Sequence, residues 1–478
     1  IRDIEAYIDD SDRPAYYIVN LEPSGYVIVS ADDRIEPIIG FAADGVYDFS
    51  YENPLVALVT SDLSGRVETV ASFLRIENNA GTASPHTFYL QTTIEAQSPG
   101  ITQGKWRLFI DLAEDSEAGF RLMSVTNPGD IRVLPLLQSQ WGQAKACGED
   151  LYNYYTPSNY PSGCVATAMA QVMRYDEYPT VGIGVHEFAI GVSGERGQNA
   201  YTRGGDGLGG AYNWSDMPLR PLAICDTITE TQRQAIGAVC YDAGIAVETQ
   251  YESDGSGASM TDARDAMVEI FQYSSAVLGY DSERNIHSAL TEMINPNLDA
   301  KAPVILAISD PLNPGAGHAV VCDGYGYDSS TLYHHLNMGW NSIDDLWYNL
   351  PDVNAEHAKY TTVFGCIYNI STSGAGEIIS GRVLDRDGRP IINAKVSAEP
   401  GGRSPLMVWT DDRGIYAFES LISNTNYTIW PAADGYVFSS QQVRTMRSDS
   451  DSTRVGNRWG IDFYAESVLN APPPDIFY

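Results

Sequence analysis

Three parts of the chain differ in how apolar and polar residues alternate, and each pattern predicts a different kind of unit. In the first, residues 1–130, "AYYIVNLEPSGYVIVSADDRIEPIIGF" holds two β-rich runs around a Pro-Ser-Gly turn, which indicates a hairpin. The next segment, "NPLVALVTSDLSGRVETVASFLRIENN", has apolar residues at helical spacing. The acidic, turn-rich "DLAEDSEAGFRLMSVTNPGD" is typical of a linker. We therefore expect residues 1–130 to form a small α+β domain.

The second part, residues 131–372, places helical patterns before strand patterns. Helical spacing follows Cys164 and recurs in "TQRQAIGAVCYDAGIAV" and "MTDARDAMVEIFQ". Strand-like runs come afterwards in "APVILAIS", "HAVVCDGYGY", "TLYHHLN" and "TTVFGCIYNI". Helices followed by strands predict an α+β domain.

The third part, residues 376–466, alternates polar and apolar residues between Asp-Gly, Pro-Gly and Arg-Gly turns. This alternation in "IISGRVLDRDGRPIINAKVSAEPGGRSPLMVWTDDRGIYAFESL" predicts an all-β, antiparallel sandwich. The proline-rich tail, residues 467–478, is expected to be extended.

Composition and charge restrict the possible partners. The chain has 478 residues, 44% of them hydrophobic and 19% charged, which fits a globular protein of several domains. Its formal net charge of −33 disfavours nucleic acid and anionic membranes as partners. No apolar run is long enough for membrane insertion. The first residues, "IRDIEAYIDD", contain no signal peptide, so we expect a secreted or cell-surface protein whose export signal has been removed, or else a cytoplasmic fragment.

The cysteines and histidines do not predict a metal site. Six cysteines in a chain of this length imply no disulfide scaffold, and neither a CxxC pair nor an HExxH motif occurs. Accordingly we expect no metal and no cofactor. If Cys164 stays free, at least one more of the other five must also be unpaired.

Cys164, in "PSGCVATAMAQVMRYDEYP", is the candidate nucleophile. Pro161, Ser162 and Gly163 are typical of a helix start, and the residues after Cys164 favour a helix. A thiol in the first helical turn gains thiolate character from the free amides and the helix dipole. We expect Gly163 to leave room for a substrate backbone. The alternative is a buried core thiol, since cysteine is often buried.

A nucleophilic cysteine needs a base, and His318 in "NPGAGHAVVCDGYGY" is the candidate. A hairpin folded symmetrically about residues 327 and 328 would bring Asn337 opposite His318, where its amide could orient the imidazole. His318 and Asn337 follow Cys164 by 154 and 173 residues, a loose match to papain-like spacing. His318 could instead be a structural residue beside a strand.

An oxyanion donor is expected upstream of Cys164. "LLQSQWGQAKAC" offers Gln140 and Gln143, either of which could pair its side-chain amide with the Cys164 backbone N–H around a tetrahedral oxyanion. Otherwise these are surface residues.

With these residues assembled, the chain resembles the streptopain family of papain-like cysteine proteases. The matching segments across residues 131–370 are "LLQSQWGQ", "GCVATAMAQVMRYDEYP", "YNWSDMP", "GAVCYDAGIAVETQYESDGSGAS", "GHAVVCDGY" and "YHHLNMGWNSIDDLWYNL". The resemblance implies a papain-like catalytic domain in which Cys164 is the nucleophile, His318 the general base and acid, and Gln143 the oxyanion-hole side chain.

The resemblance also implies secondary site residues and one departure. Ser256 and Gly317 match positions that line the substrate cleft. The family's "NWGWGG" reads "NMGWNS" here, so Asn337 and Trp340 are kept, whereas Met338 replaces the tryptophan that shields the histidine in relatives.

The flanking regions resemble known modules as well. Residues 1–130 are similar to the family's pro-domain, which implies an intramolecular inhibitor and a cleavage within about residues 111–131. Residues 376–466 are similar to carboxypeptidase-regulatory-like sandwiches. The sequence thus predicts a secreted cysteine endopeptidase made as a zymogen, with protein or peptide substrates. The alternatives are a catalytically impaired surface-binding protein that uses its sandwich, and an acyl transferase with the same Cys-His chemistry.

Overall fold

The computed structural model has two compact units, residues 1–122 and 123–478. It describes residues 2–8, 14–21, 25–31, 38–42, 47, 124–125, 128–281, 285–310, 313–328, 331–355 and 358–468. The helical pattern expected at residues 53–79, most of the expected cleavage region and the C-terminal tail lie outside these ranges. None of the helices within them is both long and apolar enough to cross a membrane.

The first unit contains an antiparallel sheet of four strands in sequence order. Its strands are β1 (Asp3–Ile8), β2 (Pro14–Asn20), β3 (Tyr26–Ser30) and β4 (Ile38–Ala42). Asn20 pairs with Tyr26 across the β2–β3 hairpin, so the hairpin predicted around the Pro-Ser-Gly turn is confirmed. Tyr16 and Ile18 are buried on one face of β2, as alternation along a half-buried strand requires.

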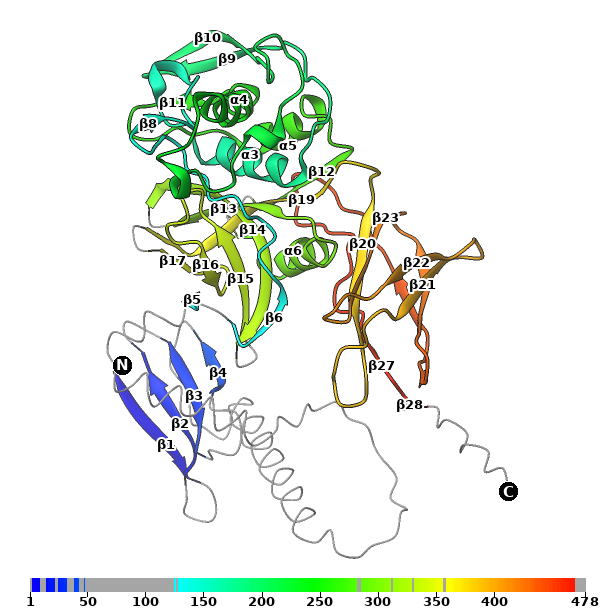
Figure 1. The fold of residues 1–478 in the computed structure, drawn as a ribbon. Coiled ribbons are helices and arrows are strands. Elements are labelled where there is room, and N and C mark those ends of the chain that lie inside the picture. Colours follow the sequence, from blue (N-terminus) through cyan, green and yellow to red (C-terminus); the bar gives the residue numbers. More distant parts are fainter. Residues whose placement is uncertain are drawn as a thin grey trace, which may run out of the picture. The chain divides into compact units, whose positions relative to one another are not determined.

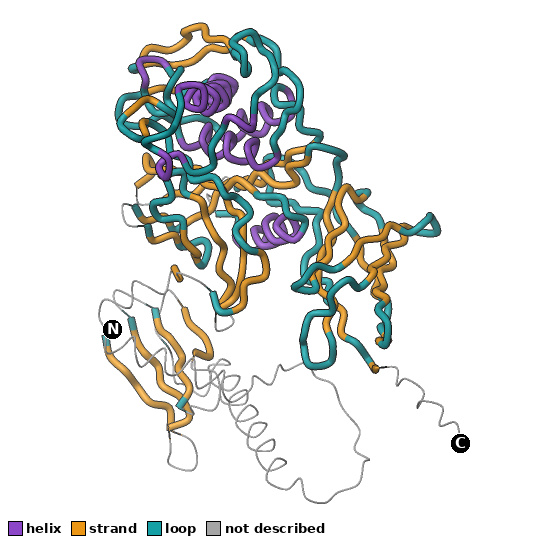
Figure 2. Tube along the Cα trace, in the orientation of Figure 1, coloured by secondary structure: helices purple, strands orange, loops and turns teal. Residues whose placement is uncertain are grey.

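The second unit begins with the central region, residues 123–372, which holds all the described α-helices (Figure 2). These are α3 (Cys164–Asp176), α4 (Glu230–Ala246), α5 (Met260–Glu269) and α6 (Leu290–Asp299), with 3₁₀ turns η2 (Pro157–Asn159), η3 (Trp214–Asp216), η4 (Pro221–Ile224) and η5 (His287–Ala289). Its strands are β5 (Ser124–Val125), β6 (Asp130–Val133), β7 (Lys145–Ala146), β8 (Glu149–Asp150), β9 (Glu187–Val192), β10 (Glu195–Tyr201), β11 (Gln250–Tyr251), β12 (Ser275–Tyr280), β13 (Val304–Asp310), β14 (Asn313–Asp328), β15 (Thr331–Asn337), β16 (Leu346–Tyr348), β17 (Val353–Asn354), β18 (Lys359–Tyr360) and β19 (Thr362–Ser371). The three predicted helices and four predicted strands of this region are therefore confirmed.

A large sheet in the order β12-β19-β13-β14-β15-β16-β5 separates two hydrophobic cores (Figure 1). On β13, Ile305 and Ala307 pack into the core made by α3, α4 and α5. Val304 and Leu306 of the same strand pack into the core that contains α6. Because successive strand side chains point to opposite faces, both faces of this sheet are buried, which explains the nearly continuous apolar run "APVILAIS".

The residues at the ends of α3, α4 and α5 explain where these helices begin. Thr229 and Gln232 form a reciprocal capping box at the start of α4, and the Ser259 side chain accepts from the amide of Thr261 in α5. By contrast, the N-cap residue of α3 is Gly163, which has no side chain to accept the first amides. The amides in the first turn of α3 are thus left without a side-chain cap, next to Cys164.

The C-terminal part of the second unit, here called the sandwich, contains two main sheets around one core. Its strands are β20 (Glu377–Leu384), β21 (Lys395–Pro400), β22 (Leu406–Trp409), β23 (Ile415–Leu421), β24 (Asn426–Ala432), β25 (Tyr436–Val437), β26 (Gln441–Arg444), β27 (Phe463–Tyr464) and β28 (Ser467–Val468). The sheet orders are β23-β20-β27 and β22-β21-β24-β26. The β20–β27 pair is parallel, so the expectation of a wholly antiparallel sandwich is wrong at this edge, where the chain returns from the far end to pair with the first strand.

The sandwich completes the hydrogen bonding of α6, the helix that sequence spacing missed. Pro296 inside α6 has no N–H for the carbonyl of Glu292, and Asn457 of the sandwich donates to that carbonyl at 3.3 Å. Arg458 also reaches the Glu292 carboxylate at 3.0 Å. A proline-containing helix can therefore persist here because a partner outside the helix satisfies the freed group.

A buried carboxylate links the same two regions. Asp299, at the end of α6, accepts from the Tyr325 hydroxyl at 2.8 Å and from the Ser380 hydroxyl of the sandwich at 2.7 Å. Burial raises the pKa of Asp299 to about 7, although both hydrogen bonds act in the opposite direction. Burial therefore favours the protonated carboxyl, and ionising it in this buried position costs free energy that the two hydrogen bonds only partly offset.

This pKa predicts a pH-dependent stability that Asp299→Asn should remove. The folded pKa lies above that of the unfolded chain, about 4, so the stability contributed by Asp299 is lost as pH rises from about 4 through about 7. We expect the urea midpoint of the variant to rise relative to wild type across this window. Asp412→Asn, which removes an exposed carboxylate of the sandwich, should show no such trend; a parallel trend in both variants would contradict the assignment.

Candidate active site

Cys164 lies at the first position of α3 and is partly exposed, whereas the nine residues after it are all buried. Ala166, Ala168 and Ala170 let this helix pack closely against its neighbours. The alternative of a fully buried core thiol therefore does not apply to Cys164, although it does apply to the free thiols of Cys240, Cys322 and Cys366.

Gly163 is required by backbone conformation and by a close neighbour. Its φ is +92°, and a Cβ at this position would lie 2.9 Å from the main-chain oxygen of Ser256. Both features disfavour any L side chain. The expected role of leaving room for substrate is thus secondary to the close approach of the Ser256 segment, which brings Ser256 beside the candidate nucleophile.

Gly163→Ala is expected to destabilise the protein by roughly 2–4 kcal/mol, because positive-φ strain and a backbone clash add together. Urea unfolding measures this loss. Gly148→Ala is the matched control, since Gly148 has φ +79° but no atom within 4 Å of the Cβ position. It should cost only about 1–2 kcal/mol, the backbone term alone. Equal losses would show that the contact with Ser256 contributes nothing.

His318 lies on β14, but the expected pairing with Asn337 is wrong. His318 is opposite Ile308 of β13, and Asn337 is opposite Val321. Asp328 pairs with Thr331, so the pairing is centred beyond residues 327 and 328, and a β-bulge between Cys322 and Gly324 shifts the register again. Asn337 therefore ends β15 before the strand reaches His318.

A main-chain carbonyl holds the imidazole instead. His318 Nε2 lies 2.8 Å from the carbonyl oxygen of Met338, which can only accept, so Nε2 carries the proton and donates. The Met338 amide in turn donates to Asp345 at 2.7 Å, so this peptide segment is fixed on both sides. Nδ1 of His318 remains for Cys164.

Two aromatic rings stack near the imidazole. Trp340 lies with its ring centroid 4.6 Å from that of His318 and Tyr360 with its centroid at 6.0 Å, at interplanar angles of 28° and 18°. Met338, the residue that replaces the family's first tryptophan, is fully buried in the core around α6. The ring that packs on His318 thus comes from Trp340, and residue 338 contributes its carbonyl.

The surroundings of Cys164 favour its thiolate. Burial acts to raise the pKa of this thiol, but the hydrogen bond and charge of His318, together with the amides of Ala319 and Val165, outweigh it, and the net shift is downward. Tyr360 responds to the same group: burial and the nearby Cys164 raise the pKa of its phenol to about 12. Cys164 and His318 therefore form an interacting pair.

The segment that carries Gln143 is tied directly to the residues before Cys164. The Gln143 carbonyl accepts from the Ser162 amide at 2.7 Å and from the Ser162 hydroxyl at 3.1 Å. The other upstream candidate, Gln140, has its amide bonded to the carbonyl of Leu219. Of the two glutamines, Gln143 is the one whose backbone is bonded next to the candidate nucleophile.

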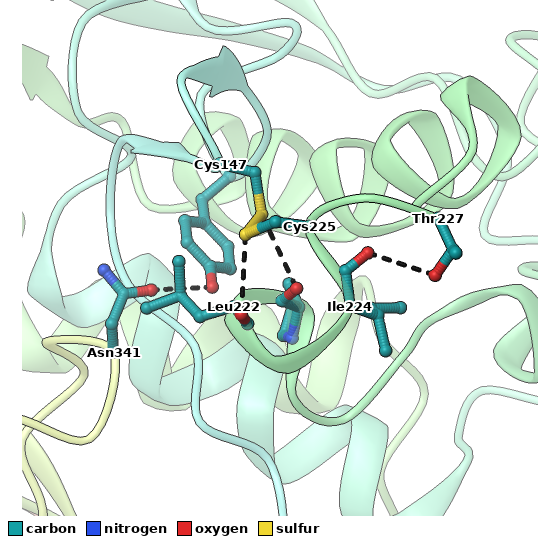
Figure 3. The surroundings of a disulfide bond; sticks show 8 residues. Cys147, Leu222, Ile224, Cys225, Thr227 and Asn341 are labelled. Carbon is teal, nitrogen blue, oxygen red and sulfur yellow. Dashed lines mark hydrogen bonds between the residues drawn. A yellow bond between two sulfur atoms is a disulfide. The ribbon is translucent and has the colours of Figure 1, made fainter.

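The departure "NMGWNS" is compatible with the local backbone. Asn341 and Ser342 have φ values of 56° and 68°, a left-handed conformation that asparagine tolerates better than most residues. The Asn341 carboxamide packs against Gly142 and accepts from the Tyr152 hydroxyl at 2.8 Å (Figure 3). The main-chain N–H of Asn341 donates to the Trp141 carbonyl at 3.1 Å, which adds another hydrogen bond to the Gln143 segment.

A disulfide joins Cys147 to Cys225 close to this segment (Figure 3). Cys147 follows the β7 strand just after Gln143, and Cys225 ends the η4 turn. The cross-link connects segments 78 residues apart in the sequence, which sequence reasoning could not pair.

Of the remaining predicted residues, Gly317 is exposed next to His318, and a Cβ there would approach only the Ile308 oxygen, at 3.9 Å. Open space beside the base is compatible with a passing substrate. The sequence reasoning missed Tyr360 and Gln171. Gln171 could have been noticed, because it is a polar residue in an apolar helix, two turns after Cys164 and thus on the same face.

Three regions of the chain match known protein families. Residues 141–348 match the model of the Peptidase C10 family, residues 2–65 that of the Spi protease inhibitor, and residues 378–455 that of the carboxypeptidase regulatory-like domain. The middle of the chain therefore matches a cysteine peptidase family. This match lies between a region that matches the Spi protease inhibitor and one that matches the carboxypeptidase regulatory-like domain.

Individual relatives differ in how much of their length is matched. The chain is 25% identical over 355 residues to the thiol protease/hemagglutinin PrtT of Porphyromonas gingivalis, covering 70% of this chain and 34% of that protein. It is 25% identical over 345 residues to streptopain of Streptococcus pyogenes, covering 71% and 74%. The chain thus spans about a third of the first relative and about three quarters of the second.

Solved structures of two forms of one protease are also similar. Active interpain A of Prevotella intermedia is 27% identical, with a TM-score of 0.41 over 51% of this chain and 97% of its own. A prointerpain A fragment is 20% identical, with a TM-score of 0.40 over 78% and 99%.

Proposed function

We propose that the chain is the zymogen of a secreted cysteine endopeptidase that hydrolyses peptide bonds through a Cys164 acyl-enzyme. The observation that carries this proposal is the Cys164–His318 pair: a thiol at a helix N-terminus with a lowered pKa, and an imidazole whose other nitrogen is held by Met338. This is the arrangement that nucleophilic thiol catalysis needs.

The chemistry follows from these groups. The Cys164 thiolate attacks the scissile carbonyl carbon, and the negative charge that develops on oxygen is met by the Cys164 amide and the Gln143 side chain. The His318 imidazolium donates its Nδ1 proton to the leaving amine as the C–N bond breaks, which leaves a thioester. His318 then takes a proton from water, hydroxide attacks the thioester, and the acid product leaves as the thiolate re-forms.

Ser256 and Gly317 would line the cleft beside this pair. Ser256 supports this role through its backbone contact with Gly163, and Gly317 through the open space next to His318. Trp340 would keep the imidazole in place by stacking. Asn337 would act indirectly, because its side chain bonds Gln171 and the Ser139 carbonyl and not His318.

Residues 1–130 would act as an intramolecular inhibitor until a cut within residues 111–131 releases the enzyme. The match of residues 2–65 to the Spi protease inhibitor model supports this. An extracellular location is supported by the Cys147–Cys225 disulfide, because such cross-links persist in oxidising compartments, and by the net charge of −33.

Limited proteolysis tests the proposal. The full chain is treated with a trace of trypsin, the N-terminal region is shown to be removed, and a mixed fluorogenic peptide library is added with and without iodoacetamide. We expect hydrolysis only after trimming, and none after alkylation. A trimmed protein that stays folded yet cleaves no peptide would overturn the proposal and favour a surface-binding role for the sandwich.

A further inference from the structure

The buried carboxamide of Gln171 forms hydrogen bonds that connect the helix of Cys164 with the Gln143 segment and with the end of β15. We propose that Gln171 is a positioning residue, which fixes the Gln143 segment and the Met338 carbonyl relative to the nucleophile helix. The inference rests on the proposed function for its meaning in catalysis, and it assigns a role to a side chain that touches neither Cys164 nor His318 in any contact described above.

Gln171 is fully buried and uses both ends of its carboxamide. Its Oε1 accepts from the Ser139 hydroxyl at 2.9 Å and from the Trp141 amide at 3.3 Å, and its Nε2 donates to Asn337 Oδ1 at 2.8 Å. The side chain comes from α3, two helical turns after Cys164. One amide thus joins the nucleophile helix to two other segments.

The first of these segments is the end of β15. Asn337 Oδ1 also accepts from the Gly339 amide at 3.1 Å, so its side chain holds the residues on both sides of Met338. Met338 in turn presents its carbonyl to His318 Nε2. Gln171 therefore fixes the orientation of His318 through Asn337 and the Met338 carbonyl, alongside the bond from Asp345 to the Met338 amide.

The second segment leads to Gln143. Ser139 and Trp141 precede Gln143 by four and two residues. The side-chain Nδ2 of Asn337 closes a ring of hydrogen bonds by donating to the Ser139 carbonyl at 2.9 Å. Downstream, the Gln143 carbonyl is held by Ser162. The oxyanion segment is thus anchored to α3 at one end by Gln171 and at the other by the residues before Cys164.

Buried side-chain amides that are hydrogen-bonded at both ends impose geometry more than they add free energy. Catalytic groups must be held within about 0.5 Å of a productive arrangement, and a displacement of 1 Å can cost about 10²-fold in rate. The three groups concerned come from α3, from β14 and from a loop, and the Gln171 side chain joins α3 to both the loop and the end of β15 by hydrogen bonds.

Gln171→Met and Gln171→Glu separate positioning from packing. Methionine keeps the length but loses every hydrogen bond, and we expect kcat of the trimmed enzyme to fall about tenfold at all pH values from 5 to 8, with KM changed less than twofold. Protonated glutamate keeps a carbonyl for Ser139 and Trp141 and an O–H for Asn337. The ratio of kcat for Gln171→Glu to that of wild type should therefore rise as pH falls, whereas the Gln171→Met ratio stays flat.

Asn297→Leu provides the matched control. Asn297 on α6 is also a fully buried amide, with hydrogen bonds to the Met293 carbonyl and to the side chain and amide of Asn369, on the other face of the large sheet. We expect it to lower the thermal midpoint as much as Gln171→Met does, while kcat per titrated active site stays within twofold of wild type. If all three variants lose kcat in proportion to stability, the proposal is wrong.

Alkylation of Cys164 by iodoacetamide makes the result independent of peptide hydrolysis. A loosely held imidazole stabilises the thiolate less, so Gln171→Met should slow alkylation at pH 6 several-fold, and Asn297→Leu should not. If wild type alkylates fast at pH 6 but cleaves no peptide, the proposed function fails and the positioning role stands on this rate. If Gln171→Met and Gln171→Glu both alkylate and turn over like wild type, the positioning role is overturned.

Discussion

Cys164→Ala should abolish peptide hydrolysis by the trimmed enzyme, lowering kcat by about 10⁴-fold or more, while the unfolding midpoint stays close to that of wild type. Loss of a covalent nucleophile removes the whole acyl-enzyme route, so the remaining groups act only on bound water. The fold should tolerate the change because alanine is a good helix residue and Cys164 is partly exposed at the start of α3. A fluorogenic assay and a thermal melt on the same sample measure both quantities.

Cys240→Ala is the matched control for this variant. Cys240 is a fully buried free thiol on α4, and burial raises its pKa far above the ordinary value for a thiol, so it is not a nucleophile at neutral pH. The variant should keep wild-type kcat and still incorporate one iodoacetamide at pH 6. Residual hydrolysis in Cys164→Ala that survives iodoacetamide would contradict the assignment of Cys164.

His318→Ala should lower kcat about 10³-fold, within the range for losing a general acid and base. It should also change the pH dependence of Cys164 alkylation. Burial raises the pKa of this thiol and His318 is the leading group that lowers it, so without the imidazole the thiolate should form only at higher pH. The alkylation rate near pH 6 should therefore collapse, and should recover as pH rises toward and beyond 9.

His186→Ala controls for the loss of an imidazole elsewhere. His186 is an exposed residue just before β9 whose ring bonds the carbonyl of Ile183. Neither kcat nor the alkylation profile should change in this variant. A His318→Ala enzyme with an unshifted alkylation profile would mean that the helix N-terminus alone activates Cys164.

The pattern of apolar and helix-forming residues was sufficient to predict α3, α4 and α5, although α3 buries nine consecutive residues instead of a single stripe. It was insufficient for α6, where Pro296 and the two asparagines beside it disfavour a helix. That helix depends on Asn457, more than 150 residues away in the sequence, to satisfy the carbonyl that the proline leaves free. Local patterns do not contain such a partner.

The chemical identities of Cys164 and His318 could be predicted, but their support could not. A reactive functional group can be identified from the residue type alone. The register of β14 against β15 depends instead on the position of the turn and on a β-bulge, and no residue type predicts either of them. The predicted contact between Asn337 and His318 was wrong for this reason. Gln171 and Asn337 meet only once the sheet is assembled beside α3.

The hydrogen bond from His318 to Met338 has a consequence for how this site can change over generations. A backbone oxygen belongs to every amino acid, so no single-codon substitution at position 338 deletes the acceptor. Drift there is constrained by the volume of a buried side chain and by the N–H that donates to Asp345. Selection for the correct orientation of His318 should therefore act on Asn337 and Asp345, whose side chains hold the backbone around Met338. Related chains should accordingly exchange large apolar residues at position 338 freely while retaining an amide at position 337 and an acid at position 345.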